Sequence, residues 1–196
     1  MQKDDRNMQK VIRAAQKGDE RAFEALLGSL ERQVYRLCYS MTHAREDAED
    51  ATQETMIKLW RTLPSYRFEC PILPYTLRMA RNTALDVLRR RNARIQTVSM
   101  TVQDEAGESE AIDVADSDEY ANPARAYERQ ERVQSIRAAI DELSPDQRDI
   151  IVLKDLEGYS YEQIGQILQI GEGTVKSRLS RARKKLAEIL KARNIF

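Results

Sequence analysis

The segment 171–186 combines cations and small hydroxyl side chains at a spacing that suits contacts with DNA. Its apolar residues Val175, Leu179, Ala182 and Leu186 recur as on one face of a helix. Cations on the other face suit phosphates, and short polar side chains can approach base edges. This polar face comprises Lys176, Ser177, Ser180, Arg181, Arg183 and Lys184, flanked by Arg178 and Lys185. Taken alone, the pattern also fits a solvated basic face on a surface helix.

The residues just before this segment indicate a helix-turn-helix. Ser160, followed three residues later by Gln163, has the form of a capping box, which begins a helix. Residues 161–168 then form a short amphipathic pattern, and 170–173 is typical of a tight glycine-containing turn. A helix, a turn and a basic second helix in this order would place the second helix in the major groove. DNA binding therefore becomes the favoured interpretation of the whole stretch.

A second candidate nucleic-acid surface lies in the N-terminal half. Residues 64–74 form a proline-bounded loop that holds Tyr66, Arg67 and Phe68, the mix of rings and cation that can stack on and pair with an unstacked base. The helix predicted to follow over 75–91 has an apolar side and a basic ridge. The ridge comprises Arg78, Arg81, Asn82, Arg89, Arg90, Arg91 and, just beyond, Arg94. Such a ridge beside an aromatic loop suits single-stranded or melted DNA.

The helix predicted over 44–63 divides into a core face and an outward face. The expected core face comprises Ala48, Ala51, Thr55, Met56, Leu59, Trp60 and Leu63. The expected outward face comprises Asp47, Asp50, Gln53, Glu54, Ile57, Lys58 and Arg61. Acids near its beginning and bases near its end suit the helix dipole, so a well-capped exposed helix explains the pattern. An apolar Ile57 among polar residues equally suits a docking surface for a partner.

Charge along the chain separates two basic segments by an acidic one. Residues 1–94 hold 18 Lys and Arg against 13 Asp and Glu, and residues 125–196 hold 14 against 11. Residues 95–124 hold 8 acids and no Lys or Arg, so the formal net charge of the chain is zero. Two basic modules joined by an acidic segment are typical of nucleic-acid binding, although the net charge of the whole chain is zero. Residues 95–122 lack periodicity and are typical of a flexible acidic linker.

The composition favours an all-α fold with two small helical domains. Aromatic residues are 6% and charged residues 33% of the chain, which suits narrow apolar stripes on helices better than a sheet sandwich. Periodicity predicts four helices in each domain, over about 5–17, 19–41, 44–63 and 75–91, and over about 124–143, 145–157, 161–168 and 171–186. The expected domains are therefore 1–94 and 124–196, joined by the linker 95–123.

Metal, disulfide, catalytic and membrane roles are not indicated. Cys38 and Cys70 without a histidine cluster make neither a zinc site nor a disulfide framework, and we place the single His43 at a helix junction. The chain offers no Ser/His/Asp set and no glycine-rich phosphate loop. It also has no apolar run near 18 residues and no signal peptide. We therefore expect a cytoplasmic protein that is not an enzyme and has no cofactor or metal.

Four motifs carry a family resemblance. They are Asp47-Ala-Glu-Asp-Ala-Thr-Gln-Glu54 with Leu59-Trp60, Ala80-Arg-Asn-Thr-Ala-Leu-Asp-Val-Leu-Arg-Arg-Arg91, Leu143-Ser-Pro-Asp-Gln-Arg148, and Gly173-Thr-Val-Lys-Ser-Arg-Leu-Ser-Arg-Ala-Arg183. On these motifs the chain resembles bacterial RNA polymerase sigma factors of the extracytoplasmic-function (ECF) type. The resemblance implies a subunit that binds core polymerase, recognises −35 and −10 promoter elements and promotes DNA melting.

The resemblance also implies a role for each motif. Core polymerase would be bound, through the clamp helices of its largest subunit, by Asp47, Asp50, Gln53, Glu54, Ile57 and Lys58. The −10 element would be contacted by Tyr66, Arg67, Phe68, Glu69, Arg78, Arg81, Asn82, Asp86 and Arg89. The −35 element would be contacted by Thr174, Lys176, Ser177, Arg178, Ser180 and Arg181. The polymerase flap and an anti-sigma factor are further implied partners, and the acidic linker would thread towards the RNA exit channel.

One departure from the family and one alternative function accompany this interpretation. Family members usually carry Trp-Leu where this chain has Tyr75 and Thr76, so a ring is kept but the −10 contact differs. Met56 stands where the family usually has Phe. The alternative is a repressor or activator that uses only the helix-turn-helix and gives the N-terminal half a sensing or dimerising role. The aromatic loop and basic ridge of 64–94 argue against it, because a sensor needs neither.

Overall fold

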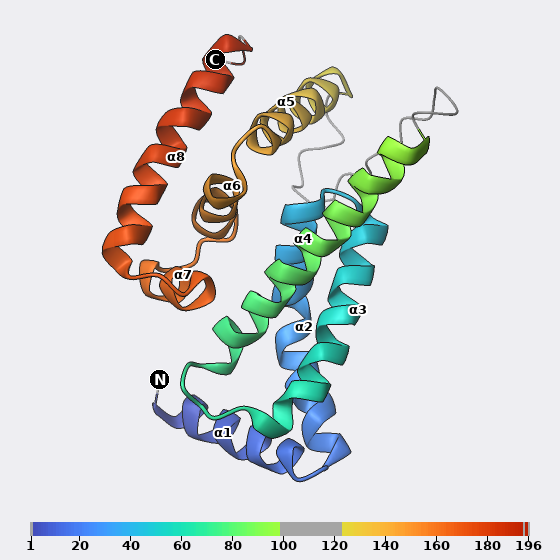
Figure 1. Cartoon of the computed structure of the whole chain (residues 1–196), viewed down its shortest axis with the longest axis vertical. Helices are drawn as coiled ribbons and strands as arrows, with labels where there is room; N and C mark the ends of the chain where they lie inside the picture. The colour runs from blue at the N-terminus through green and yellow to red at the C-terminus, as the bar shows by residue number, and fades with distance from the viewer. Residues whose placement is uncertain (1, 99–122, 194, 196) are drawn as a thin grey trace. The chain divides into compact units, whose positions relative to one another are not determined.

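The computed structural model describes residues 2–98, 123–193 and 195, and every regular element within these ranges is helical (Figure 1). The chain divides into two compact units. The first contains α1 (Gln2–Gln16), α2 (Glu20–Thr42), α3 (Arg45–Thr62), the short 3-10 turn η1 (Leu63–Ser65) and α4 (Ile72–Val98). The second half contains α5 (Pro123–Asp141), α6 (Pro145–Ile151), the π-helical turn η2 (Val152–Leu156), α7 (Tyr161–Leu168) and α8 (Glu172–Ala192). The prediction of an all-α fold with four helices in each half is confirmed.

Helix α4 is longer at both ends than the sequence predicts. It begins at Ile72 and so takes in Pro74, which the first turn of a helix tolerates because its N–H groups have no intrahelical acceptor. It continues to Val98, through residues 95–98 of the predicted linker, because no Pro or Gly interrupts 92–98. The remainder of the predicted linker, 99–122, lies outside the described residues.

Helix α2 forms the centre of the N-terminal unit and contacts α1, α3 and α4. Asp19 caps it by accepting a hydrogen bond from the Ala22 N–H at 3.1 Å, and His43 ends it in the left-handed conformation. The core around the α1–α2 and α3–α4 connections comprises Ile12, Ala15, Phe23, Leu26, Leu30, Leu59, Leu63, Tyr66 and Ile72. These residues fix the loop after α3 against α1, which matters for the candidate site.

Three threonines are buried where α2, α3 and α4 contact one another. Thr52, Thr55 and Thr76 are buried, and each hydroxyl donates to the carbonyl four residues earlier at 2.7 to 2.8 Å. This bonding satisfies the hydroxyl within its own helix, so the polar side chain can be buried at little cost.

Two hydrophobic residues lie differently from the sequence prediction. Trp60, expected on the core face of α3, is 46% exposed, and its ring makes an edge-type contact with Phe23, with ring centroids 4.4 Å apart. Leu156, which the apolar spacing of the predicted helix 145–157 places with Ile150, Ile151 and Leu153, is instead 45% exposed. The π-helical turn η2 explains the second case, because its wider turn rotates later residues away from the α-helical register.

The C-terminal unit packs α8 against α6 and α5. Its core includes Ile140, Leu143, Ile150, Ile151, Leu153, Val175, Leu179, Ala182 and Ile189. The capping box predicted at the start of α7 is confirmed, because Gln163 accepts from the Ser160 N–H at 2.9 Å and the Gln163 N–H donates to Ser160 Oγ at 3.2 Å. None of the helices in the described part of the chain has the length and apolar character needed to span a membrane.

Candidate nucleic-acid interface

The helix-turn-helix is built from α7, a turn over 169–171 and α8. Gln169 takes the left-handed conformation with φ of 56°, and Gly171 caps α8. The Ile170 N–H donates to the Gly165 carbonyl at 3.0 Å, which closes the turn against α7. A Cβ atom at Gly165 would lie 2.8 Å from the Ile170 carbonyl oxygen, so only glycine allows this approach. The angle between the two helices therefore depends on a residue that sequence analysis did not single out.

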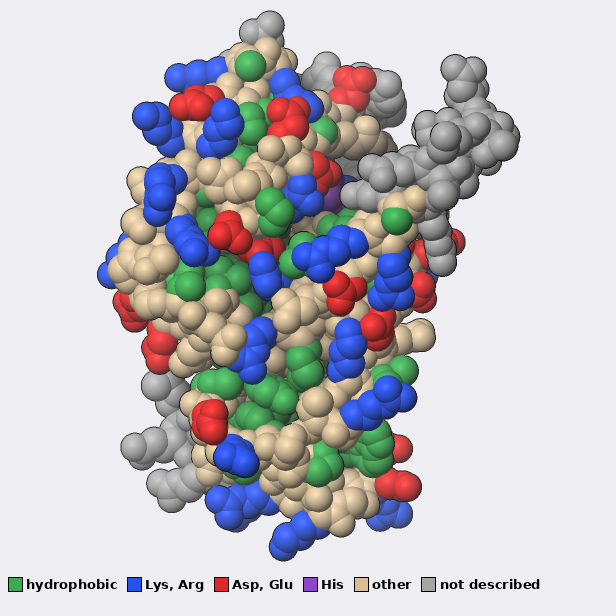
Figure 2. All heavy atoms as spheres, viewed as in Figure 1, with side chains coloured by type: hydrophobic (Ala, Val, Ile, Leu, Met, Phe, Trp, Pro, Cys, Tyr) green, Lys and Arg blue, Asp and Glu red, His purple; other side chains and the backbone are tan. Residues whose placement is uncertain are grey.

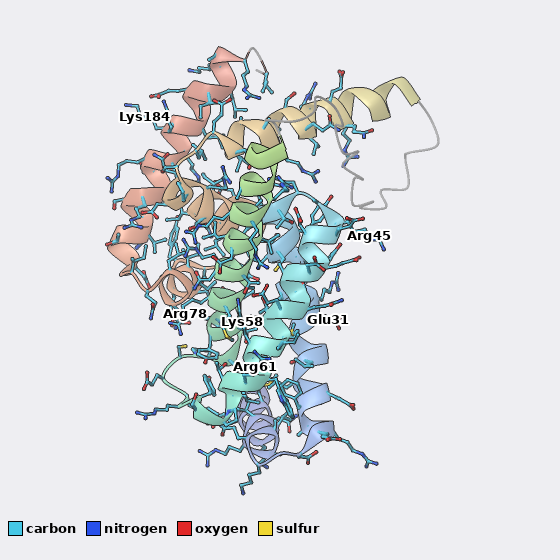
Figure 3. All side chains as sticks on the ribbon, turned by 45° about the vertical axis from the view of Figure 1, so that its right-hand side comes forward. Glu31, Arg45, Lys58, Arg61, Arg78 and Lys184 are labelled. Atoms are coloured by element: carbon cyan, nitrogen blue, oxygen red, sulfur yellow. The ribbon has the colours of Figure 1, made fainter. Side chains whose placement is uncertain are left out.

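The outward face of α8 agrees with the periodicity in the sequence. Val175, Leu179 and Ala182 are buried, whereas the predicted polar residues Thr174, Lys176, Ser177, Ser180 and Arg181 are exposed. Figure 2 shows Lys and Arg side chains over α8 and also over α4. Figure 3 shows Lys184 extending outward from α8 and Arg78 on α4. The face of α8 thus offers cations and hydroxyls together.

Two of the α8 arginines are engaged within the unit. Arg178 pairs with Asp146 of α6 at 3.1 Å, and Arg183 forms two hydrogen bonds with Asp155 of η2, one of them at 3.0 Å. The Asp155 contact also raises the pKa of Arg183 above its ordinary value. These pairs brace α8 against the preceding helices. Arg178, predicted to contact DNA, therefore also has a structural partner.

Lys154 is a candidate that sequence reasoning missed. Its Nζ lies 5.0 Å from the centroid of the Tyr161 ring, and Lys176 Nζ lies 5.6 Å from the same centroid. Lys154 also donates to the Tyr159 carbonyl at 3.1 Å. A cation over an aromatic ring is held in place by the ring's quadrupole. Tyr161 thereby brings Lys154 beside α8, a juxtaposition that no short motif in the sequence indicates.

The loop after α3 differs from its predicted role at Tyr66. We call residues 66–71, between η1 and α4, the 66–71 loop. The Tyr66 ring was expected to be free for stacking on a base, but it is 7% exposed and packs against Phe68 and Tyr75, with ring centroids 4.8 and 5.0 Å away. Its hydroxyl donates to the Cys70 carbonyl at 2.5 Å. Burial, with smaller contributions from Cys70 and Tyr75, raises the pKa of Tyr66 to about 12. Tyr66 therefore packs in the core and stabilises the loop.

Phe68 occupies a strained position within the 66–71 loop. Its φ is 60°, in the left-handed region that a bulky side chain rarely adopts. Such a backbone costs of order 1–3 kcal/mol and persists only where the surroundings impose it. Phe68 is half-buried, whereas Arg67 and Glu69 on either side of it are exposed. The loop thus presents one aromatic ring, on a strained backbone, between two charged side chains.

Two residues of α1 hold this loop, and no pattern in the sequence indicates either. Gln16 Nε2 donates to the Leu63 carbonyl at 3.0 Å and to the Tyr66 carbonyl at 2.8 Å. The Arg13 guanidinium lies 5.5 Å from the centroid of the Phe68 ring. These contacts join segments about 50 positions apart in the sequence, so only the fold reveals them.

The ridge of α4 carries the other predicted −10 residues. Arg78 lies over the Tyr75 ring, 5.5 Å from its centroid, and Arg81 donates to the exposed Asn82 at 3.0 Å. Arg89, also exposed, pairs with Asp86 at 3.0 Å. The ring that stands in place of the family's Trp therefore has a cation over it. The predicted residues follow one another along α4 from the 66–71 loop onward.

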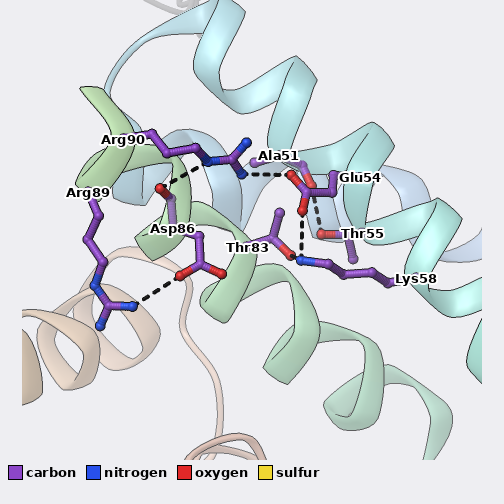
Figure 4. Close-up of polar contacts among 8 residues, drawn as sticks. All are labelled: Ala51, Glu54, Thr55, Lys58, Thr83, Asp86, Arg89 and Arg90. Carbon is purple, nitrogen blue, oxygen red and sulfur yellow. Dashed lines mark hydrogen bonds and ion pairs between the residues drawn. The ribbon is translucent and has the colours of Figure 1, made fainter. Parts of the chain in front are cut away.

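The polar face of α3 is tied to α4 by an ion-pair network (Figure 4). Glu54 accepts from Lys58 at 2.9 Å through one oxygen and from Arg90 at 2.9 Å through the other. Lys58 also donates to the Thr83 hydroxyl at 2.9 Å. The hydrogen bonds from Lys58 and then Arg90 lower the pKa of Glu54. Arg90, predicted as part of the basic ridge of this helix, is exposed and also paired with an acid.

The six residues predicted to bind core polymerase fall into two groups. Asp47, Glu54 and Lys58 are engaged with α4, since Asp47 pairs with Arg91 at 2.9 Å. Asp50, Gln53 and Ile57 are exposed, Ile57 by 52%. Gln53 also lines a shallow groove between α2 and α3, together with Tyr35 and Thr52. Among the described residues, no group of three or more His, Cys, Asp and Glu side chains could hold a metal ion.

Two family models match the two units. Residues 26–94 match sigma-70 region 2, and residues 133–186 match sigma-70 region 4. The alternative, a repressor or activator, gave the N-terminal half a sensing or dimerising role, whereas this half matches sigma-70 region 2. The family resemblance carried by the four motifs is confirmed.

Relatives extend the match over nearly the whole chain. The RNA polymerase sigma-H factor of Pseudomonas aeruginosa is 31% identical over 93% of this chain and 93% of its own length. The ECF RNA polymerase sigma factor SigM of Mycobacterium tuberculosis is 32% identical over 95% of this chain and 86% of its own. The sigma factor RpoE of Bartonella quintana, solved in complex with the anti-sigma factor NepR, is 26% identical with a TM-score of 0.60 over 86% of this chain and 96% of that one. The chain therefore belongs to the ECF-type RNA polymerase sigma factors, a non-catalytic family with sigma-70 regions 2 and 4 that serves promoter recognition.

Proposed function

We propose that the two units divide the promoter between them, and that α8 reads the −35 element as duplex DNA. The observation that carries this proposal is the exposed face of α8, where Lys176, Ser177, Ser180 and Arg181 stand opposite a buried apolar face. A helix of this kind at the second position of a helix-turn-helix can enter the major groove. Thr174 and Arg178 complete the set, with Arg178 shared between DNA and Asp146. Lys154, held beside Lys176 by Tyr161, adds a phosphate contact.

In this proposal the N-terminal unit holds the −10 element as an opened strand. Arg67, Phe68 and Glu69 in the 66–71 loop take an unstacked base, and Tyr66 supports them from the core. Arg78, Arg81, Asn82, Asp86 and Arg89 follow the strand along α4. Each stack of a base on an aromatic ring contributes roughly 1–3 kcal/mol, which favours the melted over the paired state. In this proposal residues 1–94 form the N-terminal domain, 95–123 the linker and 124–196 the C-terminal domain.

The α3 face is proposed to dock on the clamp helices of core polymerase. Asp50, Gln53 and Ile57 lie exposed on one helix face, where polar side chains border an apolar one, as a polar rim borders the apolar centre of an interface. Asp47, Glu54 and Lys58 border it, already oriented by their α4 partners. The flap of the polymerase is the proposed contact of the C-terminal unit. The chain would act in the cytoplasm, where the polymerase and promoter are found.

An anti-sigma factor is the further partner that we propose. The support is that a relative of the same fold, RpoE of Bartonella quintana, was solved in complex with the anti-sigma factor NepR. On this chain such a partner would cover the face around Ile57 and the half-exposed Trp60. Covering that face would block core polymerase from the same residues.

In vitro transcription tests the function directly. Core polymerase is supplied with a library of promoters that vary at the −35 and −10 positions, with and without this chain. We expect initiation that depends on the chain and on both elements. Absence of chain-dependent initiation would refute the proposal.

Two single variants test the assignment of surfaces. Arg181→Ala should weaken binding to the selected −35 duplex by about 1–3 kcal/mol and relax preference at −35 positions alone, whereas Lys191→Ala, at the exposed end of α8, should change neither. Asp50→Ala should weaken the affinity for core polymerase in a titration, with the exposed Glu24→Ala of α2 as control. Altered −10 preference in Arg181→Ala, or equal polymerase affinity in Asp50→Ala and Glu24→Ala, would contradict the assignment concerned.

A further inference from the structure

Helix α1 and the 66–71 loop form a bridged pair. The two Gln16 hydrogen bonds, at 3.0 and 2.8 Å, run to the carbonyls of Leu63 and Tyr66, which stand at the two ends of the η1 turn. The Leu63 carbonyl also accepts from the Tyr66 N–H at 3.0 Å. Gln16 is partly buried, so its amide donates into a region with little competition from water. One side chain of α1 therefore sets the exit of the chain from α3.

The contact continues through Tyr66 to the far end of the loop. The Tyr66 carbonyl accepts from Gln16, and the Tyr66 hydroxyl donates to the Cys70 carbonyl at 2.5 Å. Phe68, with its φ of 60°, lies between these two anchors, and Arg13 of α1 covers its ring at 5.5 Å. Strained backbone needs surroundings that impose it, and here α1 supplies two of the restraints.

We propose that α1 positions the 66–71 loop for the unpaired strand, with Gln16 as the positioning residue that acts through Tyr66. The proposal rests on the proposed function, in which this loop takes an unstacked base. A loop that is ordered before binding avoids the entropic cost of ordering during binding, so the restraint increases affinity without touching DNA. Helix α1 precedes the segment 26–94 that matches sigma-70 region 2, so the match assigns no role to Gln16 or Arg13.

The hydrogen-bond direction supplies a sharp test. Two carbonyls accept from Gln16, so the role needs a donor, and the isosteric Gln16→Glu removes it at neutral pH. Gln16→Lys changes the shape but keeps a donor group. Both variants alter charge, which by itself changes the affinity for DNA. Gln9, exposed on the same helix, provides the matched controls Gln9→Glu and Gln9→Lys.

The experiment measures binding of a labelled single-stranded DNA to the full chain by fluorescence anisotropy. The strand is first selected from a random-sequence pool by retention on the wild-type chain. We expect Gln16→Glu to bind it about tenfold more weakly than Gln9→Glu, since two hydrogen bonds of modest net strength are lost. Gln16→Lys should stay within about threefold of Gln9→Lys, because a donor remains. The affinity for core polymerase should be the same in all four variants.

Three results would overturn the inference. Equal strand affinity in Gln16→Glu and Gln9→Glu would show that the two hydrogen bonds do not act on the loop. A loss in Gln16→Lys as large as in Gln16→Glu would assign the effect to side-chain shape. A parallel loss of polymerase affinity would indicate that the whole unit is unfolded. Failure of the proposed function would be seen earlier, in the selection step, because the wild-type chain would then retain no strand from the pool. In that case the inference would have no basis either.

Discussion

Replacing Gly165 by alanine is expected to have two opposing effects on the stability of the C-terminal unit. In an ordinary helical position, replacing glycine by alanine stabilises a protein by about 0.4–1 kcal/mol, because the unfolded chain loses freedom. At Gly165 the new Cβ would lie 2.8 Å from the Ile170 carbonyl oxygen, a distance that real Cβ contacts essentially never show. The clashing atom belongs to backbone, so it cannot move aside as a flexible side chain would. The turn between α7 and α8 must therefore shift.

The expected magnitude follows from the two opposing terms. Overpacking of this kind costs typically about 1–3 kcal/mol. A shift of the turn also weakens the hydrogen bond from the Ile170 N–H to the Gly165 carbonyl, now 3.0 Å long, and a hydrogen bond contributes about 1 kcal/mol net. After subtracting the gain from alanine, we expect a net destabilisation of the C-terminal unit of about 1–2 kcal/mol.

The assay must report on the C-terminal unit alone. The only tryptophan, Trp60, lies in α3, so its fluorescence follows the N-terminal unit. Peptide-level hydrogen exchange of α6 and α8 in the full chain gives the opening free energy of the other unit. Gly173→Ala is the matched control, because nothing lies within 4 Å of a Cβ there. If α6 and α8 are as well protected from hydrogen exchange in Gly165→Ala as in Gly173→Ala, the steric argument is refuted.

Two further predictions concern titratable side chains of the N-terminal unit. Burial raises the pKa of Cys38 to about 11, although a hydrogen bond with Thr52 opposes the shift, so iodoacetamide should label the partly exposed Cys70 in the native chain and Cys38 only after denaturation. Because the pKa of Cys38 in the folded state lies above the ordinary 9.0, its contribution to stability is complete below pH 9 and is lost as the pH rises towards 11; equal labelling of both thiols would contradict this. The pKa of Glu54 is lowered from its ordinary 4.5, so its ion pairs should stabilise the unit at neutral pH and cease to do so as the pH falls below that value. Since the carboxylate is 38% exposed, Glu54→Gln should cost less than about 1 kcal/mol in urea unfolding at low salt, and a loss of several kcal/mol would show that the network is screened far less than its exposure indicates.

Periodicity predicted the faces of the helices because a face is a local property of the sequence. Val175, Leu179 and Ala182 are buried at their predicted positions on α8, and Ile57 is exposed as expected. The prediction for Trp60 was wrong because its burial depends on residues of other helices, and it stays 46% exposed beside the Phe23 ring. The end of the apolar pattern at Leu156 was misread for a different reason, since a π-helical turn changes the register within a single helix.

Pairings between distant segments lie outside what such patterns can predict. The sequence indicates a polar outward face on 44–63, suited equally to an exposed helix or a docking surface, and a basic ridge on 75–94 suited to melted DNA. The fold brings them together, so that Glu54 pairs with Arg90 and Asp47 with Arg91, both at 2.9 Å. These four charges are compensated within the chain before any partner arrives. Docking through Glu54 must therefore either keep Arg90 as a shared neighbour or exchange it for a cation of the polymerase. Asp50 has no ion pair among the described residues, so docking through Asp50 requires no such exchange. Asp50→Ala is for this reason a cleaner test of the polymerase surface than Glu54→Ala, because it leaves the contacts between α3 and α4 in place.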